Sequence, residues 1–142
     1  MDRPVTFDDP RVQRFLDTKD IILLATLNPD GAPLITVMWF LHDPAALTLI
    51  SVDGLQKVRN LRRDPRLHLV AESGARGDEI KGVAIRGRAE FLDDTADRRR
   101  LVTRIVDKYH PHLEGYWGGR AMPADRVMFR VVPREVRTWG LD

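Results

Sequence analysis

The sequence contains no cysteine. That absence excludes disulfides, thiolate-bound metals, cysteine nucleophiles and iron–sulfur clusters. The sequence also lacks any apolar run near the roughly 20 residues that cross a bilayer, and its first ten residues have no apolar signal core. We therefore expect a cytoplasmic protein without a membrane span.

The motifs of several enzyme classes are missing as well. There is no nucleophile elbow, no glycine-rich phosphate loop ending in Lys-Ser or Lys-Thr, and no G-x-G-x-x-G after a strand. The histidines at positions 42, 68, 110 and 112 are not spaced as metal ligands. We predict no metal site and assign no catalytic side chain.

The composition is that of an ordinary globular protein. The chain has 142 residues, of which 43% are hydrophobic and 31% charged, with a net charge of +2. This size favours a single domain spanning residues 1–142. The small excess of cations favours anionic ligands, but it is too small to indicate nucleic acid by itself.

Apolar periodicity and turn residues predict a β-rich chain. Strands are expected at residues 21–27, 33–41, 47–52, 67–72, 80–92, 126–132 and 134–139. Gly82 and Gly87 indicate a bulge or bend in the long strand. Helices are expected at residues 9–18, directly after residue 54, and from a cap at 94–95 to about 109, with a loop at 115–123. Because the first three strands lack helical crossovers, we predict a mainly β fold, a small antiparallel β-barrel with flanking α-helices.

The most informative stretch is residues 51–66, where a strand ends and a basic helix begins. Lys57 lies near the first turn of that helix, close to Gln56 and after Ser51 at the end of the strand. Backbone N–H groups, the helix dipole and an ammonium group would converge there, which favours a phosphate or carboxylate. The alternative interpretation is an ordinary solvated lysine at a helix start.

Four arginines follow Lys57 at helical spacing, Arg59, Arg62, Arg63 and Arg66. One interpretation is a nucleic-acid surface, and the other is a solvated face that pairs with acidic neighbours such as Asp64. No stacking aromatic residues are interleaved with these arginines. We therefore expect a solvated face and no nucleic-acid partner.

The predicted strand at 33–41 is apolar on both faces. A flat heteroaromatic ligand could lie against its residues 36–39 and use the strand's backbone N–H and C=O groups. The alternatives are a barrel core or a dimer interface. Since a chain of this size buries only one face of such a strand in its own core, we predict a homodimer.

Four segments together carry a family pattern: residues 22–33, Ser51-Val52 with the run Lys-Val-Arg-Asn-Leu-Arg-Arg-Asp-Pro-Arg at 57–66, residues 83–91, and residues 130–140. They resemble the split β-barrels of the pyridoxamine-5′-phosphate-oxidase-like superfamily. Within it, the short chain and the run at 57–66 look most like the branch of flavin/deazaflavin oxidoreductases, whose members are homodimers that mostly use coenzyme F420. Other members of the superfamily use FMN.

The resemblance implies a cofactor site at the dimer interface. It places the tricycle of the cofactor along Ile35, Thr36, Val37 and Met38, with Ser51 and Val52 nearby. It assigns the phosphate to Gln56 and Lys57, and an approach from a paired strand to Lys81, Gly82 and Val83. Trp117 of the second subunit is expected to add a wall.

The implied function is hydride transfer between F420 and a small conjugated or heteroaromatic substrate. The alternatives are an FMN-dependent oxidase or reductase of the same fold, and a cofactor-binding module without turnover. We expect a small-molecule substrate and no membrane partner.

Overall fold

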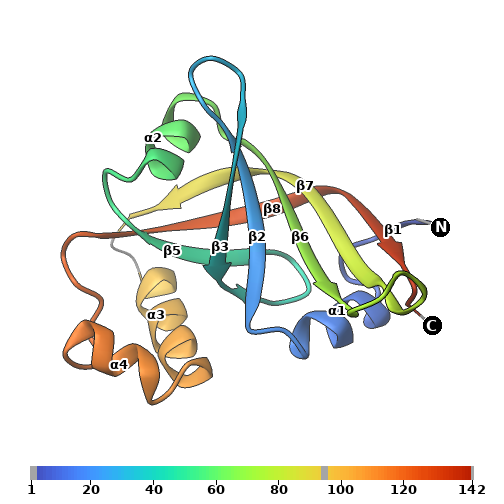
Figure 1. The fold of residues 1–142 in the computed structure, drawn as a ribbon. Coiled ribbons are helices and arrows are strands. Elements are labelled where there is room, and N and C mark those ends of the chain that lie inside the picture. The colour runs from blue at the N-terminus through green and yellow to red at the C-terminus, as the bar shows by residue number, and fades with distance from the viewer. Residues whose placement is uncertain (1–2, 94–95, 142) are drawn as a thin grey trace.

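The computed structural model describes residues 3–93 and 96–141. Along the chain, its elements are β1 (Arg3–Val5), α1 (Pro10–Asp17), β2 (Ile21–Leu27), β3 (Pro33–Trp39), β4 (Leu41–His42), β5 (Leu47–Val52), α2 (Gln56–Arg63), β6 (Arg66–Ser73), a 3₁₀ turn (Gly77–Glu79), β7 (Lys81–Leu92), α3 (Ala96–Lys108), α4 (His112–Trp117) and β8 (Arg126–Trp139) (Figure 1).

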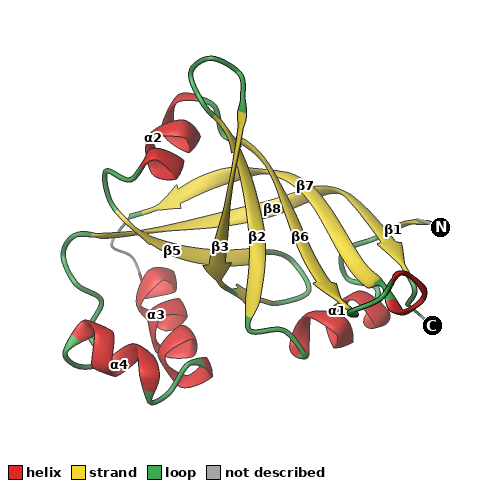
Figure 2. Ribbon diagram, viewed as in Figure 1, coloured by secondary structure: helices red, strands yellow, loops and turns green. Residues whose placement is uncertain are grey.

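One antiparallel sheet organises these elements. The described residues form an eight-stranded sheet in the order β3-β2-β6-β7-β8-β5-β4, with β1 added beside β8. The sheet curls into a half-barrel with the helices outside it (Figure 2). The predicted fold class, a mainly β barrel with flanking helices, is confirmed.

Local signals explain why the first elements start where they do. Asp9 caps α1, since its carboxylate accepts a hydrogen bond from the backbone N–H of Arg11 at 2.9 Å, and Pro10 follows in the first turn. The hairpin between β2 and β3 turns at Gly31, whose φ of 86° suits glycine. The strand β2 begins and ends at the predicted residues.

Two buried clusters stabilise the fold. The larger one fills the curl of the sheet and includes Phe40, Leu49 and Phe129, each with no exposed surface. The second lies under α3 and α4, where Leu101, Ile105 and Leu113 pack on residues of β4 and β8. Each fully buried aliphatic or aromatic side chain contributes about 1.5–3 kcal/mol of transfer free energy.

The structure corrects several of the predicted boundaries. The strand expected at 33–41 is interrupted at Phe40 and divides into β3 and β4. The two strands expected at 126–132 and 134–139 form one strand, β8. The predicted loop at 115–123 begins inside a helix, α4, and β1 was not predicted. The predicted helix cap at 94–95 lies outside the described residues.

The two glycines of β7 have different roles. At Gly87 the register between β7 and β8 shifts, as a bulge requires, and a Cβ there would lie 2.7 Å from the carbonyl oxygen of Val132. At Gly82 the register is regular, and a Cβ would lie 2.3 Å from the ring of Trp139. The bulge prediction is therefore confirmed at Gly87, whereas Gly82 makes room for an indole ring.

Candidate cofactor site

The candidate site lies where the curled sheet fails to close. β3 is the last strand at one end of the sheet, and β5 and β4 form the other end. β4 pairs only with Leu47 and Thr48 of β5, so the later residues of β5 have no strand beside them on that edge within the described chain. Two strand edges with unpaired backbone groups therefore face the opening, and such edges can donate to and accept from a flat ligand.

A cavity of about 270 Å³ lies at this opening. It is lined by Val37, Met38, Trp39, Ile50, Ser51, Val52, Leu55, Lys57, Ile105, Leu113, Trp117 and Arg126. Most of these side chains are apolar, and the polar ones are Ser51, Lys57 and Arg126. An apolar cavity with a few polar groups is typical of small-molecule sites.

Lys57 carries the unusual electrostatics of the cavity. Its side chain is half-buried, and this burial lowers the pKa of the ammonium group. Within residues 3–93 and 96–141 it has no hydrogen-bond or ion-pair partner. Arg126, in contrast, forms an ion pair with Asp125. Lys57 is thus a partly desolvated cation that lacks the anion it would normally pair with.

The N-terminus of α2 adds further donors beside Lys57. The capping residue is Leu55, whose side chain makes no capping hydrogen bond. The first N–H groups of a helix have no acceptor inside the helix, and they concentrate the positive end of its dipole. The N–H of Val58 donates to the carbonyl of Leu55, so the start of α2 combines a cation with the N–H groups of Gln56 and Lys57.

A buried asparagine holds α2 on the sheet. Asn60 has no exposed surface, and its amide donates to Thr26 Oγ1 at 3.1 Å and to Asn28 Oδ1 at 2.9 Å. Its oxygen accepts from the side chain of Gln56 at 2.8 Å. The bonds to Thr26 and Asn28 fix the helix relative to β2 and so fix the position of Lys57.

Aromatic rings pack around Trp39, which lines the cavity. Trp39 stacks on Tyr109 with ring centroids 4.4 Å apart, and Tyr116 meets Trp39 edge-on at 6.0 Å. The Tyr109 hydroxyl accepts from the N–H of Phe40 at 2.8 Å and donates to the carbonyl of Asp20 at 2.6 Å. Burial raises the pKa of Tyr109, so the phenol stays neutral.

The chain matches a known protein family. The model of the family described as pyridoxamine 5′-phosphate oxidase matches residues 8–140, nearly the whole chain. The chain belongs to this family. The resemblance read from residues 22–33, 57–66, 83–91 and 130–140 is confirmed at this level.

Solved structures from several bacteria share the fold. A conserved hypothetical protein of Mycobacterium tuberculosis is 28% identical, with a TM-score of 0.78 over 92% of this chain and 83% of that one. HutZ, the heme storage protein of Vibrio cholerae, is 15% identical, with a TM-score of 0.75 over 89% of each chain. An FAD-binding protein of Mesorhizobium loti is 21% identical, with a TM-score of 0.73 over 97% and 96%. The last two likenesses show the fold alone.

Two further findings concern the described residues as a whole. No helix among them is long and apolar enough to cross a bilayer. No group of three or more His, Cys, Asp or Glu side chains among them is placed to hold a metal ion.

The structure brings together part of the predicted site of this family member. The residues predicted for the site that line the cavity are Val37, Met38, Ser51, Val52 and Lys57. Ile35, Thr36 and Gln56 adjoin the cavity in sequence but do not line it. The side chain of Gln56 is engaged with Asn60 and Arg59 inside α2.

Lys81, Gly82 and Val83 lie elsewhere in the chain. They start β7 and pair with the end of β6, and β2 and β6 separate β7 from β3. They do not line the cavity. Trp117, which was expected from a second subunit, lines the cavity of its own chain.

Sequence reasoning missed several lining residues: Ile50, Leu55, Ile105, Leu113 and Arg126. Ile105 lies on the predicted apolar face of the long helix, which indicates burial but not what is buried against it. Arg126 is opposite Val52 in the β5–β8 pairing. Only that long-range register brings Arg126 to the cavity, so no local signal could have identified it.

The arginines that follow Lys57 have partners within the chain. Arg59 donates to the carbonyl of Gly54 at 3.0 Å, and Arg62 stacks over the ring of Phe91 at 4.2 Å. Arg63 donates to the carbonyl of Leu27, and Arg66 forms an ion pair with Asp64 at 2.7 Å. These contacts fit the interpretation of a solvated, locally paired face.

The residues at the cavity fit a flat, phosphate-bearing cofactor. Lys57 has no partner in the part of the chain that the structure describes. Among the described residues, the Ser51 hydroxyl has one hydrogen bond, a long one of 3.3 Å to the carbonyl of Val52. Polar groups left without good partners beside an apolar cavity are those that a bound polar ligand would satisfy.

Proposed function

We propose that the protein is an oxidoreductase that binds coenzyme F420 in the cavity between β3 and β5 and acts on a small conjugated or heteroaromatic substrate. The observation that carries this proposal is Lys57, a half-buried cation without an anionic partner at the start of α2. A phosphate there gains the ammonium group and the helix N–H groups together. This is the role that the family resemblance assigns to Lys57.

Each part of the cavity has a task in this proposal. Lys57 and the first N–H groups of α2 hold the phosphate, and Ser51 donates a hydrogen bond near it. The open edges of β3 and β5 orient the ring system, while Trp39, Leu113 and Trp117 exclude water from it. When bound, the cofactor supplies the hydride chemistry, which explains why the chain needs no catalytic acid, base or nucleophile.

A homodimer is part of the proposal. The outer face of β2 and β3 exposes Ile21, Ile35 and Val37, with exposed fractions of 47%, 63% and 58%. Apolar side chains this exposed on one sheet face are typical of a protein interface. The proposal assigns Lys81, Gly82 and Val83 to the site of the other subunit, because they lie away from the cavity of their own chain.

The dimer is tested by light scattering at micromolar concentration. We expect a dimer for the wild type and a monomer for Ile35→Asp, because an aspartate would bury a charge in the interface. Val132→Asp, a change at an exposed residue of β8 that lies away from β2, β3 and the start of β7, serves as the matched control. A wild-type monomer would contradict this part of the proposal.

FMN is the alternative cofactor, and binding without turnover is the alternative function. The neighbours named as FAD-binding and heme storage proteins indicate that this fold holds more than one kind of flat ligand. The choice must therefore come from measurement of this chain. Titration with F420, FMN and hemin, followed by absorbance and by the melting temperature, separates the three, since a ligand at 100 times its Kd adds about 2.7 kcal/mol.

The binding site itself is tested with Lys57→Ala. Loss of a charge-assisted contact costs about 1.5–3 kcal/mol, so we expect the affinity for F420 to fall about 10- to 150-fold. Arg59→Gln removes one charge from the same helix outside the cavity and should leave the affinity within about twofold. Equal affinities of Lys57→Ala and the wild type would refute the phosphate assignment.

Turnover is tested separately, by oxidation of reduced F420 in the presence of a panel of conjugated and heteroaromatic substrates. Tight binding with no oxidation across the panel would favour the binding module. FMN-dependent turnover without F420 binding would favour the alternative enzyme.

A further inference from the structure

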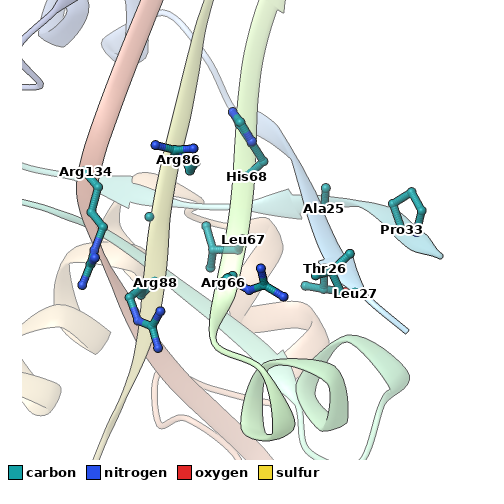
Figure 3. A pocket seen from close by; sticks show the side chains of 11 residues that line it. Ala25, Thr26, Leu27, Pro33, Arg66, Leu67, His68, Arg86, Arg88 and Arg134 are labelled. Carbon is teal, nitrogen blue, oxygen red and sulfur yellow. The ribbon is translucent and has the colours of Figure 1, made fainter. Parts of the chain in front are cut away.

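A second cavity, of about 450 Å³, lies on the outer face of the sheet. Figure 3 shows the side chains around it, from β2, β3, β6, β7 and β8. Its cations are Arg66, Arg86, Arg88 and Arg134, joined by His68, and none of the lining residues is acidic. It shares no lining residue with the cavity that contains Lys57. We call this second cavity the arginine pocket.

The strand register places like charges opposite one another in the arginine pocket. Arg66 of β6 is the direct partner of Arg88 of β7, and His68 is the partner of Arg86. Like charges directly opposite each other in antiparallel strands destabilise the pair. Arg66 opposite Arg88 is such a pair, and a bound anion would offset its unfavourable charge arrangement.

The bulge of the sheet adds the fourth arginine. The register passes from Arg86 opposite Glu135 to Gly87 opposite Pro133, so Arg134 is the extra residue of β8. A β-bulge re-aims the side chain of its extra residue. In Figure 3 the side chain of Arg134 runs along β8 to about the height of Arg88 on the neighbouring strand β7.

Only half of these guanidinium charges are neutralised within the chain. Arg66 is paired with Asp64 at 2.7 Å, and Arg86 with Glu135 at 2.8 Å. Arg88 and Arg134 have no hydrogen-bond or ion-pair partner among the residues that the structure describes. Two unpaired guanidinium groups on adjacent strands have the planar, two-donor geometry that binds phosphate and carboxylate.

The floor of the arginine pocket is apolar, with Ala25, Leu27, Pro33 and Leu67 among its lining residues. A purely inorganic anion would leave this floor uncovered, whereas an organic anion would cover it. The geometry points to a second binding site in the arginine pocket, one that takes a small organic molecule with two or more phosphate or carboxylate groups. It is independent of the proposed cofactor site.

Binding of three probes by calorimetry at low salt tests this site. ATP carries a triphosphate on an organic body, citrate carries three carboxylates, and pyrophosphate has no organic part. We expect saturable binding of ATP or citrate, with the tighter of the two identifying the anionic group, and weaker binding of pyrophosphate because it leaves the apolar floor bare. No saturable binding of ATP or citrate below millimolar concentration would overturn the proposal.

The double variant Arg88→Gln/Arg134→Gln should weaken binding at least about tenfold, since it removes two charge-assisted contacts. Arg14→Gln/Arg76→Gln removes the same charge from exposed residues outside the pocket and should bind as the wild type does. Arg88→Lys/Arg134→Lys keeps both charges and provides a second test if the glutamine variant does not fold. It should give an intermediate affinity because lysine lacks the planar, two-donor guanidinium group.

Three outcomes would overturn the assignment. An equal loss of probe affinity in both glutamine double variants would mean that the net charge of the protein attracts the probe nonspecifically. Loss of probe binding in Lys57→Ala would mean that the probe binds in the cofactor cavity and not in the arginine pocket. A shift of the Arg88→Gln/Arg134→Gln variant from dimer to monomer, with no change in probe affinity, would make the pocket part of a contact between copies of the chain.

Discussion

Two lysines of this chain, Lys57 and Lys108, are partly desolvated, and they differ in what surrounds them. Burial lowers the pKa of both ammonium groups. Lys108 donates to the carbonyl of Phe40 at 2.7 Å and lies 3.8 Å from the centroid of its ring. Asp17 and Asp20 partly offset its burial. Lys57 has no such acceptor in the described part of the chain.

The difference separates a structural cation, Lys108, from the cation that we propose binds the phosphate, Lys57. The surroundings of Lys108 satisfy its charge within the fold, so it joins α3 to the junction of β3 and β4. Lys57 keeps an unsatisfied charge at the edge of a cavity, where a ligand can reach it. A partly buried lysine is therefore informative about function only when its partners are counted.

A neighbouring residue holds each lysine in place, Asn60 for Lys57 and Tyr109 for Lys108. The largest loss of stability is expected when Asn60 is replaced. Asn60→Ala removes the three hydrogen bonds of a buried amide to Gln56, Thr26 and Asn28 and leaves their partners unsatisfied. We expect the free energy of unfolding to fall by about 2–3 kcal/mol, together with weaker F420 binding. Urea denaturation measures the first effect. Gln56→Ala, which removes one of the bonds, should cost clearly less, and an equal cost would contradict this account of α2.

Tyr109 is the anchor beside Lys108. Tyr109→Phe keeps the stacking on Trp39 but leaves the N–H of Phe40 without its acceptor. We expect a loss of about 1–2 kcal/mol in the free energy of unfolding, with cofactor affinity nearly unchanged. Denaturation and ligand titration of the same variant check both parts. A large loss of affinity would mean that Tyr109 serves the cavity and not only the fold.

The next prediction concerns Lys57 without ligand. Lys57→Met removes a partly desolvated charge that has no partner, so the variant should be as stable as the wild type or more stable by about 0.5 kcal/mol. Urea denaturation at pH 7 without cofactor measures this. A clear loss of stability would show that the fold itself satisfies Lys57, and the contrast with Lys108 would disappear.

The last prediction concerns the pH dependence contributed by Lys108, whose pKa burial lowers to about 8. An unfolded lysine has a pKa of about 10.4, so between these values the unfolded chain binds more protons. The free energy of unfolding therefore rises with pH across this window, and the gain is lost as pH falls through about 8. Compared with Lys108→Met, the wild type should gain stability from pH 8 to 10. If the free energy of unfolding changed with pH in the same way for both proteins, the prediction would be contradicted.

Much of the fold follows from local patterns. Alternating apolar residues and the turn residues around Gly31 predict β2, and the strand at 47–52 also begins and ends where expected. Both signals act over a few residues, so a sequence displays them directly. The helix α4 was missed because residues 112–117 contain a glycine and no strong cap, and the packing of Leu113 and Trp117 on the sheet stabilises it instead.

The candidate site is predictable only in part, for the same reason. Lys57, Ser51 and Val52 are neighbours in sequence, and a strand followed at once by a basic helix already indicates an anion site. Arg126, Leu113 and Ile105 join them only because the ends of the sheet approach without closing. Such contacts depend on pairings across many residues, such as Val52 with Arg126.

The sequence by itself indicated the family, most of the strands and helices in their order, and Lys57 as the cation of the proposed phosphate site. The tertiary structure decided that Trp117 belongs to the same chain's cavity, that Lys81–Val83 lie apart from it, and that arginines from separate strands gather in a second pocket. Propensity, turn chemistry and spacing are properties of short segments. The register of a sheet and the partners of a buried charge are properties of the closed fold, since side chains distant in sequence become neighbours only when the strands pair.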